Sequence, residues 1–407
     1  MKSIARALAA ASLVAAGCGP VDGPPHPPPR DLGGDGALDP DKDNDGDGFT
    51  IHQGDCNDRD ATVYPGAPEL CDGRDHNCNG ILDDTCDDDK DGWSILPGDK
   101  PGGDCDDHDP LVNPGAFDAP GNKVDDDCDG LTDNPPPPCD ASGSDAHAFA
   151  GAIDLCAPWL LAATVNGDSD PAGRGVHSRY GMFAPQMGAS FFVMSTGIAA
   201  DENDPGFVLP QPGTAFHNDD PNPLPGPKKN ACFTGTDEQT VHDYVELSLQ
   251  VKVPTNAQSF SFRFAFFSAE YPEYVGSDFN DSFFVLLDSK AYKGNISFDG
   301  SGNPITVNVA FFTACDTAPI CNGMLENVCT QSPHLLDGTG YELNDSMNQR
   351  IGGGTNWLTT TSPVSPGETA TLRFILFDEG DHLWDSAVLI DNFQWQLNPT
   401  MTPATVG

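Results

Sequence analysis

The sequence predicts a mainly β protein, in which irregular, disulfide-rich calcium-binding repeats are followed by a β-sandwich or jelly-roll domain. Three observations predict this fold class. Residues 41–133 hold 27 of the 62 Asp and Glu residues but only six of the 19 Lys and Arg residues. Gly (44 residues) and Pro (37 residues) are used often, which favours turns over helical bundles. Beyond residue 240, apolar and polar residues alternate in several short segments, as in half-buried strands.

Residues 1–17 are predicted to be a lipoprotein signal peptide. Two basic residues precede an apolar run that is too short to span a bilayer. The run ends in LVAAGC, which resembles a bacterial lipobox, so Cys18 is the predicted lipidation site. The sequence departs from the lipobox at Ala15, where Leu is usual. The alternative is an ordinary secretory signal that is cut after Gly17. No later segment is long and apolar enough for a transmembrane helix.

The cysteine count supports lipidation. Thirteen cysteines would leave one unpaired in an oxidising compartment, and lipidation of Cys18 leaves twelve. None of the twelve forms a C-x-x-C pair of the zinc or redox kind, so disulfides are expected. Their connectivity stays open, with one exception. A disulfide between Cys139 and Cys156 is the shortest link that leaves each domain with an even number of cysteines.

Proline-rich stretches divide the rest of the chain. Proline runs form extended, semi-rigid spacers. The predicted order is a tether at 18–40, two acidic repeats at 41–134, a linker at 135–140, a β-sandwich at 141–398 and a tail at 399–407.

Each acidic repeat contains an opening loop, a Gly-Asp-Cys block, a Pro-Gly-Ala block and a closing loop. Each loop places oxygen-bearing side chains at positions 1, 3 and 5, Gly at position 6 and a backbone carbonyl at position 7, which is how a loop surrounds Ca²⁺. The predicted ligands from the opening loops, and from the carboxylates that complete them, are Asp43, Asp45, Asp47, Phe49, Asp55, Asp58, Asp60, Asp87, Asp89, Asp91, Trp93, Asp104, Asp107 and Asp109. The predicted ligands from the closing loops are Asp75, Asn77, Asn79, Ile81, Asp83, Asp125, Asp127, Asp129, Leu131 and Asp133.

Position 12 of these loops is Gly, Cys, Gly and Pro instead of the carboxylate of an EF-hand, so an EF-hand pair is not expected. One alternative is a disordered acidic spacer, against which the regular glycines and buriable aromatic residues argue. Another is a transition-metal site at His52, His76 or His108, but oxygen-rich loops favour calcium.

The pattern DGDGFTI…GDCNDRDATVYPGAPELCDGRDHNCNGILDD resembles the metal-binding motif named after the MopE proteins, which is common in secreted proteins of myxobacteria and their relatives. The resemblance covers about residues 41–134. It implies a metal-binding module and does not define a cellular role.

The remaining chain predicts one helix and then strands. Residues 144–157 have helical spacing of apolar residues, with Ser144 or Asp145 as the cap. Residues 244–253 alternate with five aliphatic residues on one face, and 260–267 place four phenylalanines on one face. Further strands are expected in FFVLLD, ITVNVAFF, ATLRFILFD and SAVLIDNFQW.

Two long segments, FAFFSAEYPEYVGSDFNDSFFVLL (264–287) and LRFILFDEGDHLWDSAVLIDNF (372–393), resemble the signature segments of the choice-of-anchor L domain. FFVMSTGIA (191–199) fits an early strand of that family, and GGGTNWLTT (352–360) fits its turn before the last strands. The resemblance spans about 145–396. It implies a surface or secreted protein held by a variable anchor, here Cys18, in the cell envelope, at the outer membrane or the cell surface.

Acidic residues gather near two strand junctions of this second domain. A structural Ca²⁺ is the preferred interpretation. The candidate ligands are Glu270, Asp278, Asn280, Asp281, Asp378, Asp381, Asp385 and Asp391. Alternatives are a paired-carboxylate glycosidase site and solvated turns.

No metalloprotease, nucleophile-elbow, Walker or dinucleotide motif is present, so a non-enzymatic protein is expected. The net charge of −43 disfavours nucleic acid as a partner and favours cations. The predicted function is a calcium-binding surface lipoprotein that contacts the membrane through its lipid and displays the sandwich toward an unknown surface, matrix or glycan ligand. The alternatives are a lectin-like module, which would stack sugars on Trp357, Trp384, Tyr271 or Tyr274, and a hydrolase.

Overall fold

The computed structural model describes residues 38–95, 103–134, 139, 143–166, 170–216, 241–300, 302–307, 312–315, 320–321, 324–325, 329–342 and 352–407. The predicted signal peptide, Cys18 and nearly all of the tether lie outside these residues. The chain divides into two compact units, Met1–Cys86 and Asp87–Gly407. The predicted linker at 135–140 therefore falls inside the second unit, which contains the second repeat together with the β-sandwich.

The first unit contains the first repeat, whose only regular element among the described residues is the short helix η1 (Ile51–Gln53). Two disulfides, Cys56–Cys78 and Cys71–Cys86, hold its turns together. Its small core contains Val63, and Phe49 stacks on Tyr64 with ring centroids 5.6 Å apart. A unit this small cannot bury enough apolar surface, so cross-links do much of the stabilising.

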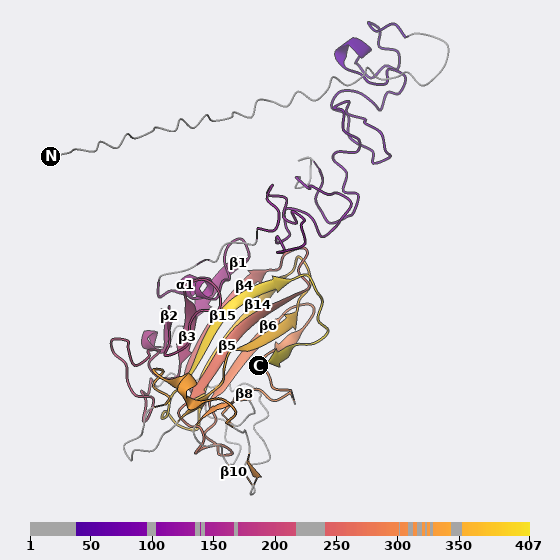
Figure 1. The fold of residues 1–407 in the computed structure, drawn as a ribbon. Helices are drawn as coiled ribbons and strands as arrows, with labels where there is room; N and C mark the ends of the chain where they lie inside the picture. Colours follow the sequence, from indigo (N-terminus) through magenta and orange to yellow (C-terminus); the bar gives the residue numbers. More distant parts are fainter. Residues whose placement is uncertain are drawn as a thin grey trace, which may run out of the picture. The chain divides into compact units, whose positions relative to one another are not determined.

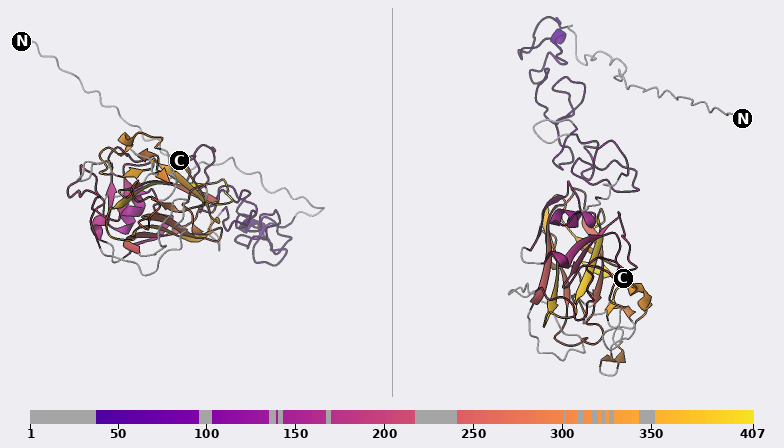
Figure 2. Two further views of the ribbon diagram at one scale, coloured as in Figure 1. Left: turned by 90° about the horizontal axis from the view of Figure 1, so that it is seen from below. Right: turned by 90° about the vertical axis from the view of Figure 1, so that its left-hand side faces the viewer.

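Two antiparallel sheets form the body of the second unit (Figures 1 and 2). The first has the order β1 (Leu160–Val165), β4 (Val241–Lys252), β14 (Thr369–Glu379), β6 (Ser282–Asp288) and β7 (Lys293–Asn295), and β8 (Ile305–Thr306) also pairs with β6. The second has the order β16 (Ala404–Val406), β13 (Leu358–Pro363), β5 (Ser259–Ser268), β15 (Ser386–Gln396), β3 (Phe191–Ser195) and β2 (Arg174–His177).

Smaller elements complete the second unit. The strand β12 (Gly353–Gly354) joins β5 to β9 (Ala314–Cys315). The others are the hairpin of β10 (Ile320–Cys321) and β11 (Met324–Leu325), and the short helices η2 (Pro171–Gly173) and η3 (Pro333–Leu336). Residues 399–407, expected as a tail, contribute β16, which pairs with β13.

The main core lies between the two sheets and confirms the predicted strand faces. Val245, Leu247, Leu249, Val251 and Val253 are buried in it, as are Phe260, Phe262, Phe264 and Phe266. Strand alternation explains this, because every second side chain points to the same face. Burying a large aromatic side chain contributes about 1.5–3 kcal/mol, so this row of phenylalanines is a major source of stability.

The predicted helix is present as α1 (Ala146–Ala152), within the expected 144–157. Asp145 is its N-cap, and its side chain accepts a hydrogen bond from the amide of Ala148 at 2.9 Å. Such a cap contributes about 1 kcal/mol. Phe149 of the helix stacks on Phe192 of β3, with ring centroids 4.6 Å apart, so the helix covers part of the main core.

The second repeat is attached to the sandwich inside the second unit. The amide of Thr255 donates to the carbonyl of Gly115 at 3.0 Å, and the hydroxyl of Thr255 donates to Asn113 at 2.6 Å. The disulfide between Cys139 and Cys156 forms as predicted. Cys315 pairs with Cys329, and Cys105 with Cys128.

Candidate metal centres

The opening loop of the first repeat brings carboxylates together. Oxygens of Asp43, Asp45 and Asp47 lie within 4.8 Å of one another, and so do oxygens of Asp45, Asp55 and Asp58. Asp45 belongs to both groups. The five residues therefore form one cluster, which we call the first cage.

The second repeat builds the same cluster from equivalent residues. Oxygens of Asp87, Asp89 and Asp107 lie within 4.8 Å of one another, as do those of Asp89, Asp91 and Asp104. We call these five residues the second cage. The two copies place a carboxylate at the same five positions although other positions differ, so the cage is a shared feature of the repeat.

Backbone amides close each opening loop around its position-1 carboxylate. The amide of Gly48 donates to Asp43 at 3.1 Å, and the amide of Gly92 donates to Asp87 at 3.2 Å. Both glycines have φ near +104°, a left-handed conformation that residues with a Cβ adopt only with strain. This explains why position 6 is Gly in both copies.

Several carboxylate oxygens in the cages are buried without a hydrogen-bond partner among the described residues. They are the Oδ2 atoms of Asp45, Asp47 and Asp55 in the first cage and of Asp89, Asp91 and Asp104 in the second. A buried, unpaired charge is costly, and such groups in folded proteins are paired or bind metals. The unpartnered oxygens belong to neighbouring carboxylates of one cage, so the residues fit a cation with oxygen ligands.

The pKa values show the same electrostatic conflict. Burial raises the pKa of Asp45, Asp55, Asp91 and Asp107, and neighbouring carboxylates raise it further. The same two causes raise the pKa of Asp104 to about 6. A bound divalent cation would favour the charged form of every cage residue and remove this repulsion.

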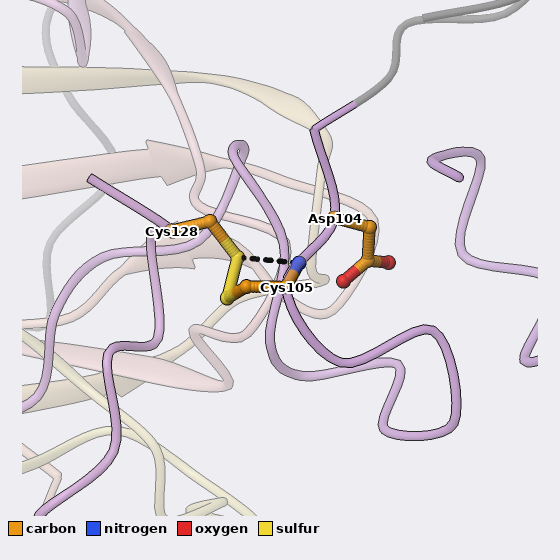
Figure 3. Close-up of side chains that lie close together, drawn as sticks. All are labelled: Asp104, Cys105 and Cys128. Carbon is orange, nitrogen blue, oxygen red and sulfur yellow. Dashed lines mark hydrogen bonds between the residues drawn. A yellow bond between two sulfur atoms is a disulfide. The ribbon is translucent and has the colours of Figure 1, made fainter. Parts of the chain in front are cut away.

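Disulfides fix one edge of each cage. Asp55 and Asp104 directly precede Cys56 and Cys105, which pair with cysteines in the closing loops. Figure 3 shows Asp104 beside the Cys105–Cys128 disulfide, in which the amide of Cys105 donates to Sγ of Cys128 at 3.1 Å. Because both sulfurs are in the disulfide, neither is a thiolate ligand, and the donors of the cage are oxygens.

The closing loops have a similar backbone but are internally hydrogen bonded. Asp75 and Asp125 each accept two amide hydrogen bonds of their own loop. Asp83 accepts the amides of Asp72 and Gly73. In the second copy, Asp133 accepts the amides of Gly121 and Lys123. No carboxylate oxygen of these loops, which lie wholly in the described part, is buried without a partner. The remaining predicted ligands, Asn77, Asn79, Asp127 and Asp129, lie in the same loops.

The position-7 residues are Phe49, Trp93, Ile81 and Leu131. In all four loops their amides donate to the side chain two residues earlier, at 2.8 Å. These bonds place the position-7 backbone beside the position-5 side chain. Coordination by the position-7 carbonyls stays a prediction.

Two predicted completing carboxylates are engaged outside the cages. Asp60 accepts hydrogen bonds from Thr62, which lower its pKa, and lies 3.5 Å from Arg74. Asp109 accepts the amide of Leu111 at 3.1 Å. The histidines considered for a transition metal each have a carboxylate partner that is not a cage residue, namely Asp41 for His52, Glu69 for His76 and Asp88 for His108.

In the sandwich, three predicted ligands come together at one end of the two sheets. Phe377 of β14 pairs with Ser282 of β6, so Asp378 and Asp281, the adjoining residues, face each other. The amide of Asp281 donates to Glu270 at 3.2 Å. Each of these three carboxylates is at most 1% exposed. Burial, followed by repulsion between them, raises the pKa of Glu270 and Asp378.

The other predicted ligands of the sandwich are used differently. Asp381, half-buried, lies close enough to raise the pKa of Glu270 and of Asp281. Asp385 accepts the amide of Thr214 on both oxygens, at 3.2 Å. Asp391 accepts the amides of Gln186 and Asn392, away from the cluster. Asp278 and Asn280 lie in the loop between β5 and β6, with Asn280 buried.

Ser386 was not among the residues predicted for this cluster. Its hydroxyl lies beside Asp281. Burial raises the pKa of Asp281 to about 7, and the neighbouring side chains of Asp378 and Ser386 lower that pKa by a smaller amount. Ser386 begins β15 in the opposite sheet. No local pattern could have revealed the contact, because only the packing of the two sheets brings these segments together.

The fold and the cages define a β-sandwich protein that carries acidic repeats whose carboxylates fit a metal ion. The family model described as "Choice-of-anchor L domain" matches residues 162–394, and the model described as "Putative metal-binding motif", of the MopE type, matches 55–91 and 104–134. The first match covers more than half of the chain, so the protein belongs to the choice-of-anchor L family. A search of curated proteins found no match.

The choice-of-anchor domain indicates a cell-surface or extracytoplasmic protein, and neither matched family is defined by an enzymatic activity. Within the described residues no helix has the length and apolarity to cross a membrane.

Proposed function

We propose that the protein is a non-catalytic, calcium-binding surface protein, anchored by lipid at Cys18, that uses its β-sandwich for adhesion or matrix contact. Two cages of five carboxylates each would hold Ca²⁺, and the ions would fix the repeats between the anchor and the sandwich. In the mature chain the Pro-rich segment 18–40 would hold the repeats away from the membrane.

The observation that carries the proposal is the set of buried, unpartnered oxygens that occurs at equivalent positions in both repeats. Hard oxygen ligands, with no sulfur or nitrogen ligand inside either cage, suit Ca²⁺ better than a transition metal. The short name of the matched repeat family refers to copper. Copper is therefore the competing ion, and it would require the histidines or other nitrogen donors.

A hydrolase active site at the acidic cluster of the sandwich is less well supported. A glycosidase needs two carboxyl groups that touch the same bond of a bound sugar, whereas Glu270, Asp281 and Asp378 are enclosed. For a lectin, Tyr271 is also unsuitable as a platform, because it is buried and stacks on Phe312 with ring centroids 4.6 Å apart. Trp357 packs against Phe183 and Phe191, whereas half-buried Tyr274 and Trp384 contact each other.

The test is calorimetric titration of the mature full chain with Ca²⁺ and, separately, with Cu²⁺. We expect at least one Ca²⁺ per cage. Asp45→Asn should abolish binding at the first cage, and Asp89→Asn at the second. Asp60→Asn and Asp109→Asn are matched controls, because they change the same residue type in the same repeats outside the cages, and should leave both affinities unchanged.

Two results would contradict the proposal. One is the absence of Ca²⁺ uptake at millimolar concentration. The other is tight Cu²⁺ binding that His76→Ala abolishes, since this would move the site from the cages to a histidine.

A further inference from the structure

We infer that Glu270, Asp281 and Asp378 form a separate, buried site for a hard divalent cation, Ca²⁺, which closes one end of the β-sandwich. This site is independent of the two repeat cages. It is built from the core of the family domain itself.

The strand pairing explains how the three residues meet. Asp281 precedes β6 and Asp378 lies near the end of β14, in neighbouring strands of one sheet. Counting in steps of two from Phe283 and Leu376, which are buried in the main core, puts both aspartates on the inner face of that sheet. Glu270 comes from the segment after β5, in the opposite sheet, so the cluster bridges both sheets.

The cluster contains unpartnered oxygens, which an ordinary group of acidic residues lacks. Asp281 is 0% exposed, and within the described residues neither of its carboxylate oxygens has a hydrogen-bond partner. The same is true of Oδ1 of Asp378, a residue 1% exposed. By contrast, Glu368, another buried acid of the sandwich, accepts the amides of Lys290 and Ser365. Glu368 shows that a buried acid of this sandwich can have both oxygens bonded, whereas neither oxygen of Asp281 is.

Protein cations do not compensate the cluster. No ion pair between described residues involves Glu270, Asp281 or Asp378, and the charged neighbours that act on Glu270 are Asp281 and Asp381. Three enclosed carboxylates must therefore either bind protons or bind a cation. One divalent ion among the three carboxylates would remove the repulsion that Asp281 exerts on Glu270 and that Asp281 and Glu270 exert on Asp378. It would also give the unpartnered oxygens of Asp281 and Asp378 a partner.

The chemistry of the donors selects the kind of ion. Carboxylates, with the Ser386 hydroxyl beside Asp281, are hard oxygen ligands, and Ca²⁺ accepts six to eight of them in flexible geometry. The half-buried carboxylate of Asp381 at the edge of the cluster can complete the charge balance. An ion at this place would tie the segment after β5 to the segment between β14 and β15. Those two segments carry Tyr274 and Trp384, which contact each other with ring centroids 4.9 Å apart.

The first test counts bound Ca²⁺ in the full chain by equilibrium dialysis and metal analysis. Asp281→Asn removes one charge with little change of shape and should lower the count by one ion, while the ions of the two cages remain. Glu368→Gln is the matched control, since it changes a buried acid with bonded oxygens, and should leave the count unchanged. An unchanged count in Asp281→Asn would overturn the inference. Loss of the cage ions alone, as in Asp45→Asn with Asp89→Asn, would leave one ion bound here.

The second test remains valid if Asp281→Asn does not fold. Tb³⁺ is added to the intact chain, and its luminescence is excited through tryptophan. Trp384→Phe should remove a component of the signal, because that ring contacts Tyr274, on which Glu270 and Asp381 of the proposed site act. Trp93→Phe, which copies Phe49 of the first repeat, should remove only the component from the second cage. If Trp384→Phe has no effect on the Tb³⁺ signal, the inference is wrong.

Discussion

Asn256 of the sandwich and Phe117 of the second repeat form a reciprocal pair of hydrogen bonds. Asn256 Oδ1 accepts the amide of Phe117 at 3.0 Å, and its Nδ2 donates to the carbonyl of Phe117 at 2.9 Å. Both residues are buried. The amide side chain thus pairs with the repeat backbone as a neighbouring strand would, and it makes the second repeat part of the domain's folded unit.

Asn256→Ala should therefore loosen the second repeat. Two buried backbone groups lose their partners, which costs about 1–3 kcal/mol. The adjacent contact runs from Thr255 through Asn113 to the cage residue Asp91, so Ca²⁺ affinity at the second cage should also fall. Denaturant unfolding and Ca²⁺ titration measure the two effects.

Asn295→Ala is the control for that variant. Asn295 also bonds to the backbone through both atoms of its amide, but within the sandwich: it accepts the amides of Val285 and Ser297 and donates to the carbonyl of Ser297. It should lower the free energy of unfolding without changing Ca²⁺ affinity. Equal Ca²⁺ affinities in Asn256→Ala and Asn295→Ala would show that the contact with Phe117 does not support the cage.

The Cys56–Cys78 disulfide should matter more for the first cage than Cys71–Cys86 does. Cys56 follows Asp55 directly, so the double substitution Cys56→Ala with Cys78→Ala frees a cage residue. We expect weaker Ca²⁺ binding at the first cage and unchanged binding at the second. Cys71→Ala with Cys86→Ala removes a cross-link of comparable loop length, which contributes about 3 kcal/mol in the chain-entropy view. If both pairs weaken Ca²⁺ binding equally, general loosening is the cause.

The ion pair of Arg373 and Glu246 should give a pH-dependent contribution to stability. Nε and Nη2 of Arg373 contact the two Glu246 oxygens at 2.6 and 2.8 Å. Burial raises the pKa of Glu246, but the hydrogen bonds from Arg373 and Tyr244 outweigh it and bring the pKa below 4.5. Because the folded-state pKa is lowered, the contribution is present above pH 4.5 and is lost as the pH falls through the folded-state pKa.

Arg373→Met should consequently lower the free energy of unfolding by about 1–2 kcal/mol at neutral pH. The effect is modest because Arg373 is partly exposed and solvent screens its charge. The difference from the unsubstituted protein should shrink in unfolding experiments at acid pH. Arg373→Lys keeps the charge but loses the paired geometry. Its free energy of unfolding should therefore lie between those of Arg373→Met and the unsubstituted protein. A difference that does not depend on pH would exclude the Glu246 carboxylate as its source.

Cys18→Ser tests the anchor. Lipidation requires the thiol, so the substituted protein should leave the membrane fraction or remain unprocessed, whereas the unsubstituted protein should sediment with membranes and begin at an acylated Cys18. Mass spectrometry of the mature N-terminus is the measurement. A soluble, unsubstituted protein that begins at another residue would rule out the lipoprotein.

The local pattern of the sequence was sufficient for the opening loops of the repeats. The spacing of Asp43, Asp45 and Asp47 and the glycine at position 6 act within one turn, so the opening loop can be derived from neighbouring residues alone. The alternation in β4 and β5 likewise defined the buried faces, because side-chain direction in a strand follows position. Ser144 and Asp145 were the two predicted caps of the helix, and Asp145 is the N-cap of α1.

Only the tertiary structure decided which distant residues meet. Asp60 and Asp109 have the same spacing in both repeats and still face Thr62 and the amide of Leu111, since competing hydrogen bonds, which spacing does not reveal, determine their direction. Glu270, Asp281 and Asp378 come from three strand ends, and the sequence analysis had assigned them to two junctions. Sheet order and register, which depend on how the whole core packs, bring them to one buried point.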